Sequence, residues 1–263
     1  MNGPEGVKTH SANGRPKSET LPSGQDRALL VRDMFDRIAG RYELLNNVMT
    51  VGMHRIWNRK VVKAAELRRN GWALDLACGT GSLTRDLAKK VGPGGHVLGI
   101  DFSSKMLTVA EARPQHNIEY RLGDATNLKT VPTESYDATT IAYGARNIPN
   151  LDALFSEMSR VVVPGGTVVC LEIARPSGKL SSKFYGLWFD KIVPWLGAKV
   201  SGDAWAYSYL PQSVKEFVAP DELADIMRRN GLQNVTWQRL AGGIITLHRG
   251  RKRSGAGSAR PAS

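Results

Sequence analysis

The chain has 263 residues, 41% of them hydrophobic and 23% charged, which fits one large globular domain with extensions. This composition excludes a collagen, a coiled coil and a wholly disordered chain, and no apolar run is long enough for a transmembrane helix. The net charge of +12 is uneven, because residues 27–69 carry +6, residues 249–263 carry +5 and residues 70–248 only +1. A nucleic-acid enzyme usually has basic side chains around its cleft, so we expect no nucleic-acid partner; the basic segments fit an anionic membrane surface at least as well.

Both ends of the chain have the composition of disordered segments. Residues 1–25 are rich in Gly, Ser, Pro and charge, and residues 251–263 form a basic tail of the same kind. The N-terminus lacks the apolar run of a secretory signal, and Cys78 and Cys170 make no disulfide framework. The sequence therefore predicts a cytoplasmic protein.

Residues 26–70 are predicted to form a helical cap that precedes the main domain. Leu29, Met34 and Ile38 are among apolar residues that recur at helical spacings of three and four. A turn around Gly52 is followed by a basic amphipathic helix.

Residues 71–250 alternate between short β-rich runs and helical patterns. The expected strands are 72–77, 96–101, 118–123, 136–142, 167–173, 234–240 and 243–249, and the expected helices are 82–91, 103–112, 151–162 and 220–230. Alternation with apolar strands predicts a parallel sheet covered on both faces. Only three residues (241–243) join the last two strands, too few for a parallel crossover, so these strands should pair antiparallel. The fold class is therefore α/β, with a seven-stranded, mostly parallel sheet and an antiparallel C-terminal strand.

The loop after the first strand has the features of a nucleotide site. Gly79, Thr80 and Gly81 follow this strand and precede a helix, whose first backbone N–H groups are unpaired. Glycines here allow a ligand to approach the backbone closely, although a tight strand–helix turn needs glycine for its own geometry as well.

Acidic residues at successive strand ends strengthen this interpretation. Asp101 ends the second strand, where a carboxylate accepts the hydroxyls of a ribose, and Asp124, followed by Ala125, ends the third. Either acid alone would favour the simpler explanation, a strand-end cap. Together with Asp75 at the end of the first strand, they favour a bound nucleoside cofactor.

At this point the chain resembles class I S-adenosylmethionine (SAM)-dependent methyltransferases, which have a Rossmann-like fold. The resemblance implies that Gly79, Thr80 and Gly81 hold the methionine part of SAM, that Asp101 holds its ribose, and that Asp124 and Ala125 meet its adenine. No metal is implied. A nicotinamide dehydrogenase is the main alternative, but its third glycine is replaced by Thr84.

Two flanking motifs resemble the signatures of the ubiquinone/menaquinone biosynthesis C-methyltransferases. Residues 42–59 match the first signature, with Asn47 where aspartate is usual, and residues 160–172 match the second. Residues 143–147, Tyr-Gly-Ala-Arg-Asn, are similar to a third family motif, although Ala142 replaces a serine that often precedes it. The resemblance extends over about residues 32–251.

This resemblance implies methyl transfer from SAM to a ring carbon of a polyprenylated quinol. Demethylmenaquinol, in menaquinone biosynthesis, is the favoured substrate, and a methoxy-polyprenyl-benzoquinol of ubiquinone biosynthesis is the alternative. Among enzymes, an RNA or protein methyltransferase is a rival, and a non-catalytic SAM-binding assembly subunit is a rival of a different class. The isoprenoid length, the oligomeric state and the general base stay open.

Arg146 and Asn147 are the candidate catalytic residues. The ring carbon becomes nucleophilic when a neighbouring phenol ionises, and a fixed cation favours the phenolate. We hypothesise that Arg146 stabilises this phenolate, directly or through water, and that Asn147 orients the ring. Alternatively, Arg146 anchors a carboxylate such as Asp124 or Glu172. His54 is a second candidate for the base.

An aromatic insertion at about 178–212 is the candidate lid over a lipid-binding site. Its most aromatic part, residues 184–196, has apolar residues too dense for a one-faced surface helix. A buried cover over the sheet is the alternative. With the basic helix near residues 55–69, a lid here predicts peripheral contact with an anionic membrane, at the inner face of the cytoplasmic membrane.

Overall fold

The computed structural model describes residues 24–175, residue 186 and residues 204–254. The helices are α1 (Gly24–Ile38), α2 (Tyr42–Thr50), α3 (His54–Ala64), α4 (Ser82–Val91), α5 (Ser104–Glu111), α6 (Leu151–Val161), α9 (Ala204–Glu216) and α10 (Pro220–Arg229), with short 3-10 turns η1 (Ala39–Arg41), η2 (Ala145–Asn147) and η4 (Ala241–Gly243). The strands are β1 (Trp72–Leu76), β2 (His96–Asp101), β3 (Ile118–Leu122), β4 (Tyr136–Ala142), β5 (Val162–Ile173), β6 (Leu232–Leu240) and β7 (Ile245–Lys252).

In the described part of the chain, these seven strands form one sheet in the order β3-β2-β1-β4-β5-β7-β6. The pairs among β1 to β5 are parallel, and β7 pairs antiparallel with both β5 and β6. The predicted α/β class, the mostly parallel sheet and the antiparallel C-terminal strand are confirmed.

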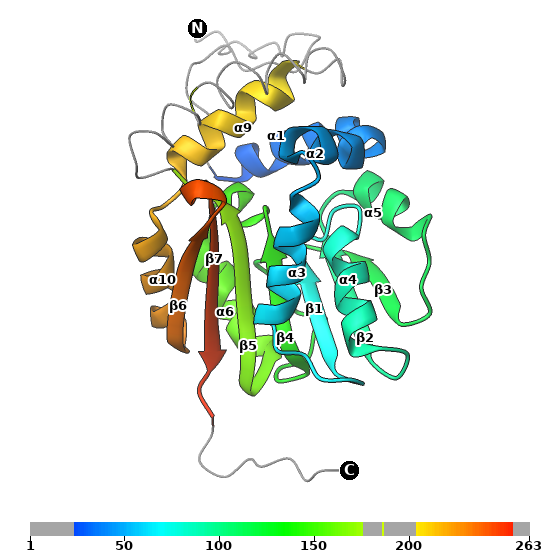
Figure 1. Cartoon of the computed structure of the whole chain (residues 1–263), viewed down its shortest axis with the longest axis vertical. Helices are drawn as coiled ribbons and strands as arrows, with labels where there is room; N and C mark the ends of the chain where they lie inside the picture. The colour runs from blue at the N-terminus through cyan, green and yellow to red at the C-terminus, as the bar shows by residue number, and fades with distance from the viewer. Residues whose placement is uncertain (1–23, 176–185, 187–203, 255–263) are drawn as a thin grey trace, which may run out of the picture.

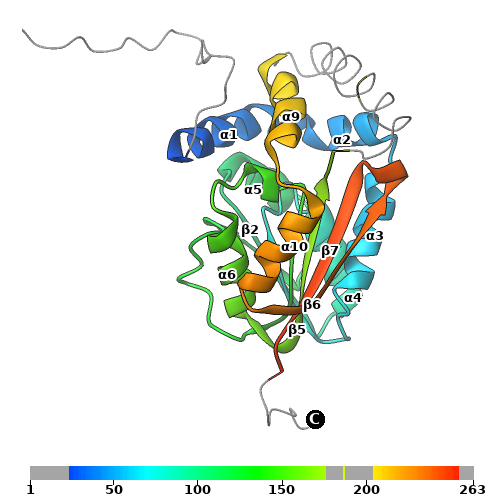
Figure 2. The ribbon, with the colours of Figure 1, turned by 90° about the vertical axis from the view of Figure 1, so that its left-hand side faces the viewer.

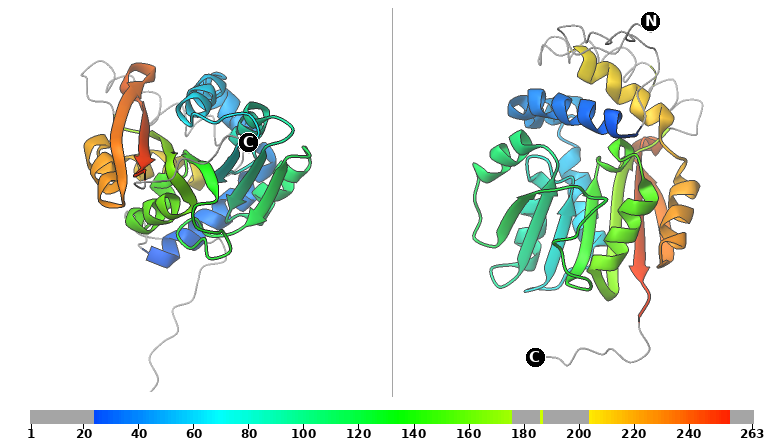
Figure 3. Two further views of the ribbon diagram at one scale, coloured as in Figure 1. Left: turned by 90° about the horizontal axis from the view of Figure 1, so that it is seen from below. Right: turned by 180° about the vertical axis from the view of Figure 1, so that it is seen from behind.

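The sheet separates two hydrophobic cores, because successive residues of a strand face opposite sides. Ala73 and Val97 pack with buried residues of α3 and α4, whereas Leu74 and Leu98 pack with those of α6 and α10. Figure 1 shows α3 and α4 in front of the sheet, and the right panel of Figure 3, seen from behind, shows α6 and α10 on the opposite face.

The N-terminal helices lie over one edge of the sheet. The carboxyl ends of the five parallel strands meet at this edge, where open α/β sheets bind their ligands. Helices α1 and α2 lie across it and α9 lies close by, as Figure 2 shows. Val31 and Met34 of α1 and Leu45 of α2 join the core on the α3 side, so the cap is packed against the domain.

The segment boundaries differ slightly from those expected. Helix α1 begins at Gly24, inside the segment expected to be disordered, and β7 runs to Lys252, two residues into the expected tail. The remainder of both tails, and most of the expected lid, lie outside the described residues. The division into tails, cap, catalytic domain and lid stays a prediction. No helix of the described ranges is long and apolar enough to span a membrane.

Candidate active site

The loop between β1 and α4 has the backbone conformation that its glycines predict. Gly79 and Gly81 have φ values of +56° and +76°, in the left-handed region, and so does Ala77 at +48°. A Cβ on Gly81 would overlap the hydroxyl of Tyr120, so a side chain is excluded there by space as well as by conformation.

Substituting alanine at Gly81 is therefore expected to lower stability. The left-handed conformation costs a non-glycine residue about 1–2 kcal/mol, and the clash with Tyr120 adds to this. Gly40→Ala is the matched control, because a Cβ at Gly40 has no neighbour within 4 Å. Thermal unfolding of both variants tests this, and equal unfolding temperatures would contradict it.

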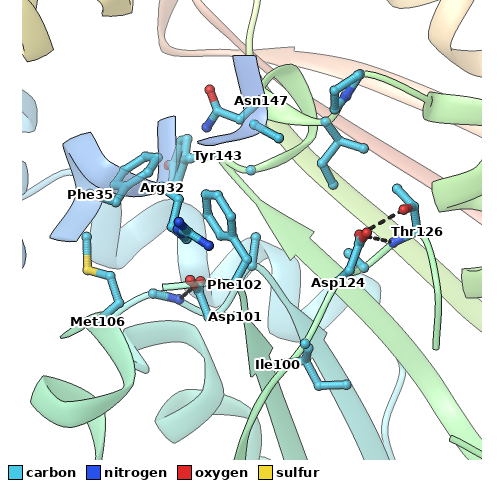
Figure 4. Close-up of a pocket in the computed structure, with 18 of the residues that line it drawn as sticks. Arg32, Phe35, Ile100, Asp101, Phe102, Met106, Asp124, Thr126, Tyr143 and Asn147 are labelled. Carbon is cyan, nitrogen blue, oxygen red and sulfur yellow. Dashed lines mark hydrogen bonds between the residues drawn. The ribbon is translucent and has the colours of Figure 1, made fainter. Parts of the chain in front are cut away.

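The two predicted acids line one cavity of about 650 Å³ at the carboxyl ends of the strands. Asp101 is buried and accepts hydrogen bonds from the backbone N–H groups of Gly79 (2.7 Å) and Ser103 (2.9 Å). Asp124 is more exposed and accepts two hydrogen bonds from Thr126, both 2.8 Å. Figure 4 shows both carboxylates in this cavity, with Arg32 and Phe35 of α1 near Asp101.

The other predicted cofactor residues are divided between this cavity, a neighbouring cavity and the turn into α4. Gly79 and Ala125 line the same cavity, while Thr80 lines a second, polar cavity of about 380 Å³ beside it. Gly81 lines neither cavity and shapes the turn into α4. The carbonyl of Thr80 accepts a 2.8 Å hydrogen bond from Arg85, which fixes the loop from the helix side.

Asp75, the third acid, has a structural role. Its carboxylate accepts 2.7 Å hydrogen bonds from Thr84 of α4 and Thr140 of β4, and so ties the helix to the sheet. Burial raises the pKa of Asp75 to about 7, although the two hydrogen bonds by themselves lower it. The acid therefore retains its proton at a far higher pH than an exposed aspartate.

A third cavity, of about 360 Å³, is lined mainly by apolar side chains of α1, α2, α3, β5 and α9. Phe35, Tyr42 and Tyr143 line both this cavity and the one that holds Asp101. The three side chains therefore stand between the larger cavity, which holds Asp101 and Asp124, and the apolar one. The aromatic insertion at 178–212, predicted to cover a lipid-binding site, contributes Tyr209 and Leu210 to this cavity. The other walls come from residues distant in the sequence, and no local pattern pointed to them.

Arg146 lines the apolar cavity and forms a buried ion pair. Its Nη1 donates to Glu172 Oε1 at 2.6 Å and to the carbonyl of Tyr143 at 2.6 Å; the two paired side chains are 8% and 0% exposed. Burial by itself lowers the pKa of Arg146, but the charge of Glu172 reverses this, and the net shift is upward. Of the two carboxylates considered as its anchor, the structure has Glu172 and not Asp124.

Asn147 lines the Asp101 cavity rather than the apolar one. Its Oδ1 accepts a 2.9 Å hydrogen bond from the hydroxyl of Tyr209, which belongs to α9 and itself lines the apolar cavity. Tyr209 was not predicted as a site residue, although it lies within the expected lid segment. The part of that segment between 187 and 203 lies outside the described residues.

Two buried polar atoms among these residues have no hydrogen-bond partner in the described part of the chain. They are the hydroxyl of Tyr143 and Nε of Arg146, and both residues line the apolar cavity. An unpaired buried donor is costly, so such groups in an otherwise apolar wall indicate a polar ligand group. Tyr143 also has a left-handed backbone, φ +59°, which is uncommon outside glycine and is often found at functional sites.

His54 borders both the polar and the apolar cavities. The Thr50 hydroxyl donates to the carbonyl of Asn46 at 2.6 Å, so its 3.0 Å contact with His54 Nδ1 makes that nitrogen the donor. This assigns the tautomer whose Nε2 is free to accept a proton. Burial, with a smaller effect of Arg55, lowers the pKa of His54, so the ring is neutral at pH 7.

The chain matches known proteins over most of its length. The model of the ubiE/COQ5 methyltransferase family matches residues 22–252. A demethylmenaquinone methyltransferase of Desulfitobacterium hafniense is 41% identical over 88% of this chain and 92% of its own length. A ubiquinone/menaquinone biosynthesis C-methyltransferase UbiE of Bradyrhizobium diazoefficiens is 37% identical over 88% of this chain and 93% of its own.

Solved structures share the fold at low identity. A SAM-dependent methyltransferase of Thermotoga maritima aligns with a TM-score of 0.60 and 19% identity, covering 84% of this chain and 99% of its own. Phosphoethanolamine N-methyltransferase 2 of Haemonchus contortus, in complex with SAM, aligns with a TM-score of 0.58 and 17% identity, covering 75% of this chain and 52% of its own. The predicted resemblance is confirmed, and the chain belongs to the ubiE/COQ5 methyltransferase family of SAM-dependent C-methyltransferases.

Proposed function

We propose that this methyltransferase transfers the methyl group of SAM to a ring carbon of demethylmenaquinol, in menaquinone biosynthesis. The observation that carries the proposal is the apolar cavity beside the Asp101 cavity, where two buried polar atoms of the wall have no partner among the described residues. A polyprenyl quinol has this character: an apolar ring and tail with two hydroxyls. An RNA or protein substrate is too polar to match an apolar wall of this kind.

The Asp101 cavity has the groups that SAM needs. We assign Asp101 to the ribose hydroxyls, Asp124 and Ala125 to the adenine, and Gly79, Thr80 and Gly81 to the methionine part. The fit of SAM is supported by the cavity volume, by the buried carboxylate of Asp101 and by the left-handed Gly79 and Gly81, which add no side chain to the loop. Bound SAM supplies an electrophilic methyl group for an in-line displacement, and this chemistry needs no metal.

Asp101 makes SAM binding pH-dependent. Burial raises the pKa of its carboxyl to about 6, against hydrogen bonds from the backbone. The ionised carboxylate is the stronger acceptor for ribose hydroxyls and predominates above that pKa. We expect SAM affinity to fall about tenfold between pH 7.5 and pH 5, measured by calorimetry. Asp101→Asn is the control, because it binds SAM more weakly with this pH dependence removed; an unchanged pH profile in that variant would contradict the assignment.

On the quinol side, Arg146 favours the phenolate next to the reacting carbon, and Asn147 orients the ring through its contact with Tyr209. Glu172 neutralises part of the Arg146 charge and holds the guanidinium at the cavity wall, so Arg146 acts as a fixed, preorganised donor. His54, neutral and with Nε2 free, is our candidate for the base that accepts the phenol proton.

The naphthoquinol substrate is supported by the name of the 41% identical relative, and the methoxy-benzoquinol alternative by the name of the 37% identical one. The two substrates differ in the ring that enters the apolar cavity. Because the long isoprenoid tail makes either substrate a membrane lipid, we also propose that the enzyme works in the cytoplasm, at the surface of the membrane.

Methyl-labelled SAM with reduced short-chain demethylmenaquinone, run beside the methoxy-benzoquinol analogue, tests the proposal. Label in the naphthoquinol alone is the expected result, and label in both would mean a shared enzyme. Label in neither product, with SAM binding intact, would overturn the quinol assignment. Full activity in the presence of a chelator is expected.

A further inference from the structure

The turn between α2 and α3 and the outer face of α3 form an exposed surface of mixed apolar and basic character. We call it the α2–α3 surface; its members are Val51, Met53, Arg55, Ile56, Arg59, Lys60 and Lys63. On the other side of α3, Trp57, Asn58 and Val61 are buried. Lys60 and Lys63 therefore lie on the exposed side of α3, and Arg55 and Arg59 are exposed at the border of the polar cavity. Helix α3 itself lies in front of the sheet in Figure 1.

The charge on this surface has one sign. Residues 44–65 contain no Asp or Glu. None of the four basic side chains forms an ion pair or hydrogen bond with any described residue. The neighbouring acids Glu43 and Glu66 are already paired, Glu43 with Arg85 and Arg113 and Glu66 with arginines of β7. The surface is therefore free to meet an anionic partner.

The apolar members are unusually exposed. Val51 is 76% exposed, Ile56 44% and Met53 39%. Val51 also ends α2 in the left-handed conformation, φ 50°, where glycine or asparagine is usual and a β-branched residue is strained. An apolar side chain with this exposure gains no burial energy in the isolated molecule, so its exposure is better explained by a contact with an apolar phase.

Two of these three apolar residues border the apolar cavity. Val51 and Met53 line it together with the buried Trp57 and the partly buried Tyr143. The cavity assigned above to the quinol therefore reaches the surface at the α2–α3 turn, among these exposed apolar side chains. A tail too long for a cavity of about 360 Å³ has its exit here.

We propose that the α2–α3 surface docks on an anionic phospholipid bilayer, with Val51, Met53 and Ile56 among the acyl chains and the four basic side chains at the phosphates, so that the isoprenoid tail passes directly between bilayer and cavity. Only the passage of the tail rests on the proposed function; the docking does not. The mixture of exposed apolar and basic groups at an apolar opening favours a bilayer over RNA, which would call for a basic and polar surface.

Co-sedimentation with vesicles that contain no quinol tests the docking alone. The full chain is expected to bind vesicles with 30% phosphatidylglycerol and to bind pure phosphatidylcholine far less. Each basic residue near an anionic surface strengthens binding about fivefold, so Lys60→Glu/Lys63→Glu is expected to weaken it about thirtyfold or more. Lys105→Glu/Lys129→Glu is the matched control: both lysines are exposed, have no ion pair with a described residue and lie outside this surface, so this variant should bind nearly as wild type.

A second variant tests the apolar contact without changing charge. Val51→Asn relieves the left-handed strain and preserves the fold, yet it is expected to lower vesicle binding several-fold. Three results would each overturn the proposal. They are an equal loss of vesicle binding in the two charge-reversal variants, equal binding of the wild-type chain to neutral and anionic vesicles, and binding of the chain to RNA but not to vesicles.

Activity assays separate this proposal from the proposed function. With a short-chain, water-soluble quinol and no vesicles, Lys60→Glu/Lys63→Glu should keep the wild-type rate, since neither lysine lines a cavity. Surface-dependent vesicle binding without quinol methylation would refute the proposed function and leave the docking intact. Methylation of the soluble quinol without vesicle binding would refute the docking alone.

Discussion

Replacing Arg146 by glutamine is expected to lower both stability and methyl transfer, and only the loss of stability should be reversible by a second substitution. Arg146→Gln leaves the fully buried Glu172 without its cation, which costs about 3–5 kcal/mol of unfolding free energy. Adding Glu172→Gln removes the uncompensated charge, so the double variant should recover most of the unfolding temperature. Its rate should stay about 100- to 1,000-fold below wild type, because the donor that favours the phenolate is absent.

Thermal unfolding and initial rates, measured on the same preparations, test this prediction. Glu157→Gln/Arg160→Gln is the control, because it neutralises another ion pair (2.7 Å) whose side chains line none of the three cavities. That variant should keep its rate per folded molecule. Recovery of methyl transfer in Arg146→Gln/Glu172→Gln would show that Arg146 only anchors Glu172, which is the alternative that the sequence left open.

The sequence predicted the scaffold well, because strand and helix periodicities are local signals. The strand at 96–101 and the helix at 82–91 have the expected boundaries. The main error was at β5, which begins at Val162 rather than at residue 167. Its Pro-Gly-Gly run is typical of a turn, but the strand continues through an irregular register opposite Tyr136 and Ala138. A Cβ on Gly166 would clash with the backbone of Asp137, so close strand approach explains this glycine.

The candidate site was only partly predictable for a related reason. The glycine loop and each acid at a strand end can be recognised from a single short segment of the sequence. Asp101 and Asp124, predicted in this way, do line one cavity. The apolar cavity is different, since α1, α2, β5 and α9 contribute to it from positions more than 150 residues apart. The pairing of Arg146 with Glu172 likewise depends on β4 and β5 being neighbours in the sheet, which the sequence did not establish.

Tyr143→Phe is expected to reduce activity without reducing stability. The Tyr143 hydroxyl is buried and has no partner among the residues that the structure describes, and burial raises its pKa far above the usual value, so it is a neutral donor. Removing an unsatisfied buried hydroxyl should leave the unfolding free energy unchanged or raise it by about 1 kcal/mol. If the hydroxyl donates to the quinol oxygen that becomes the phenolate, its loss should lower kcat/KM for the quinol about 10- to 100-fold, the value of a hydrogen bond to a charged group.

Tyr209→Phe provides the contrast. The Tyr209 hydroxyl already donates to Asn147 at 2.9 Å, so its removal breaks an existing hydrogen bond and should lower stability. A hydroxyl that is already paired within the protein should behave like that of Tyr209 and cost stability when removed, whereas an unpaired hydroxyl that waits for a ligand lowers stability until the ligand binds. Tyr143→Phe with wild-type kcat/KM would contradict a contact between this hydroxyl and the quinol. If Tyr143→Phe is more stable but methylates the quinol poorly, the wild-type protein accepts a loss of stability at this unpaired donor because the donor is needed in the reaction.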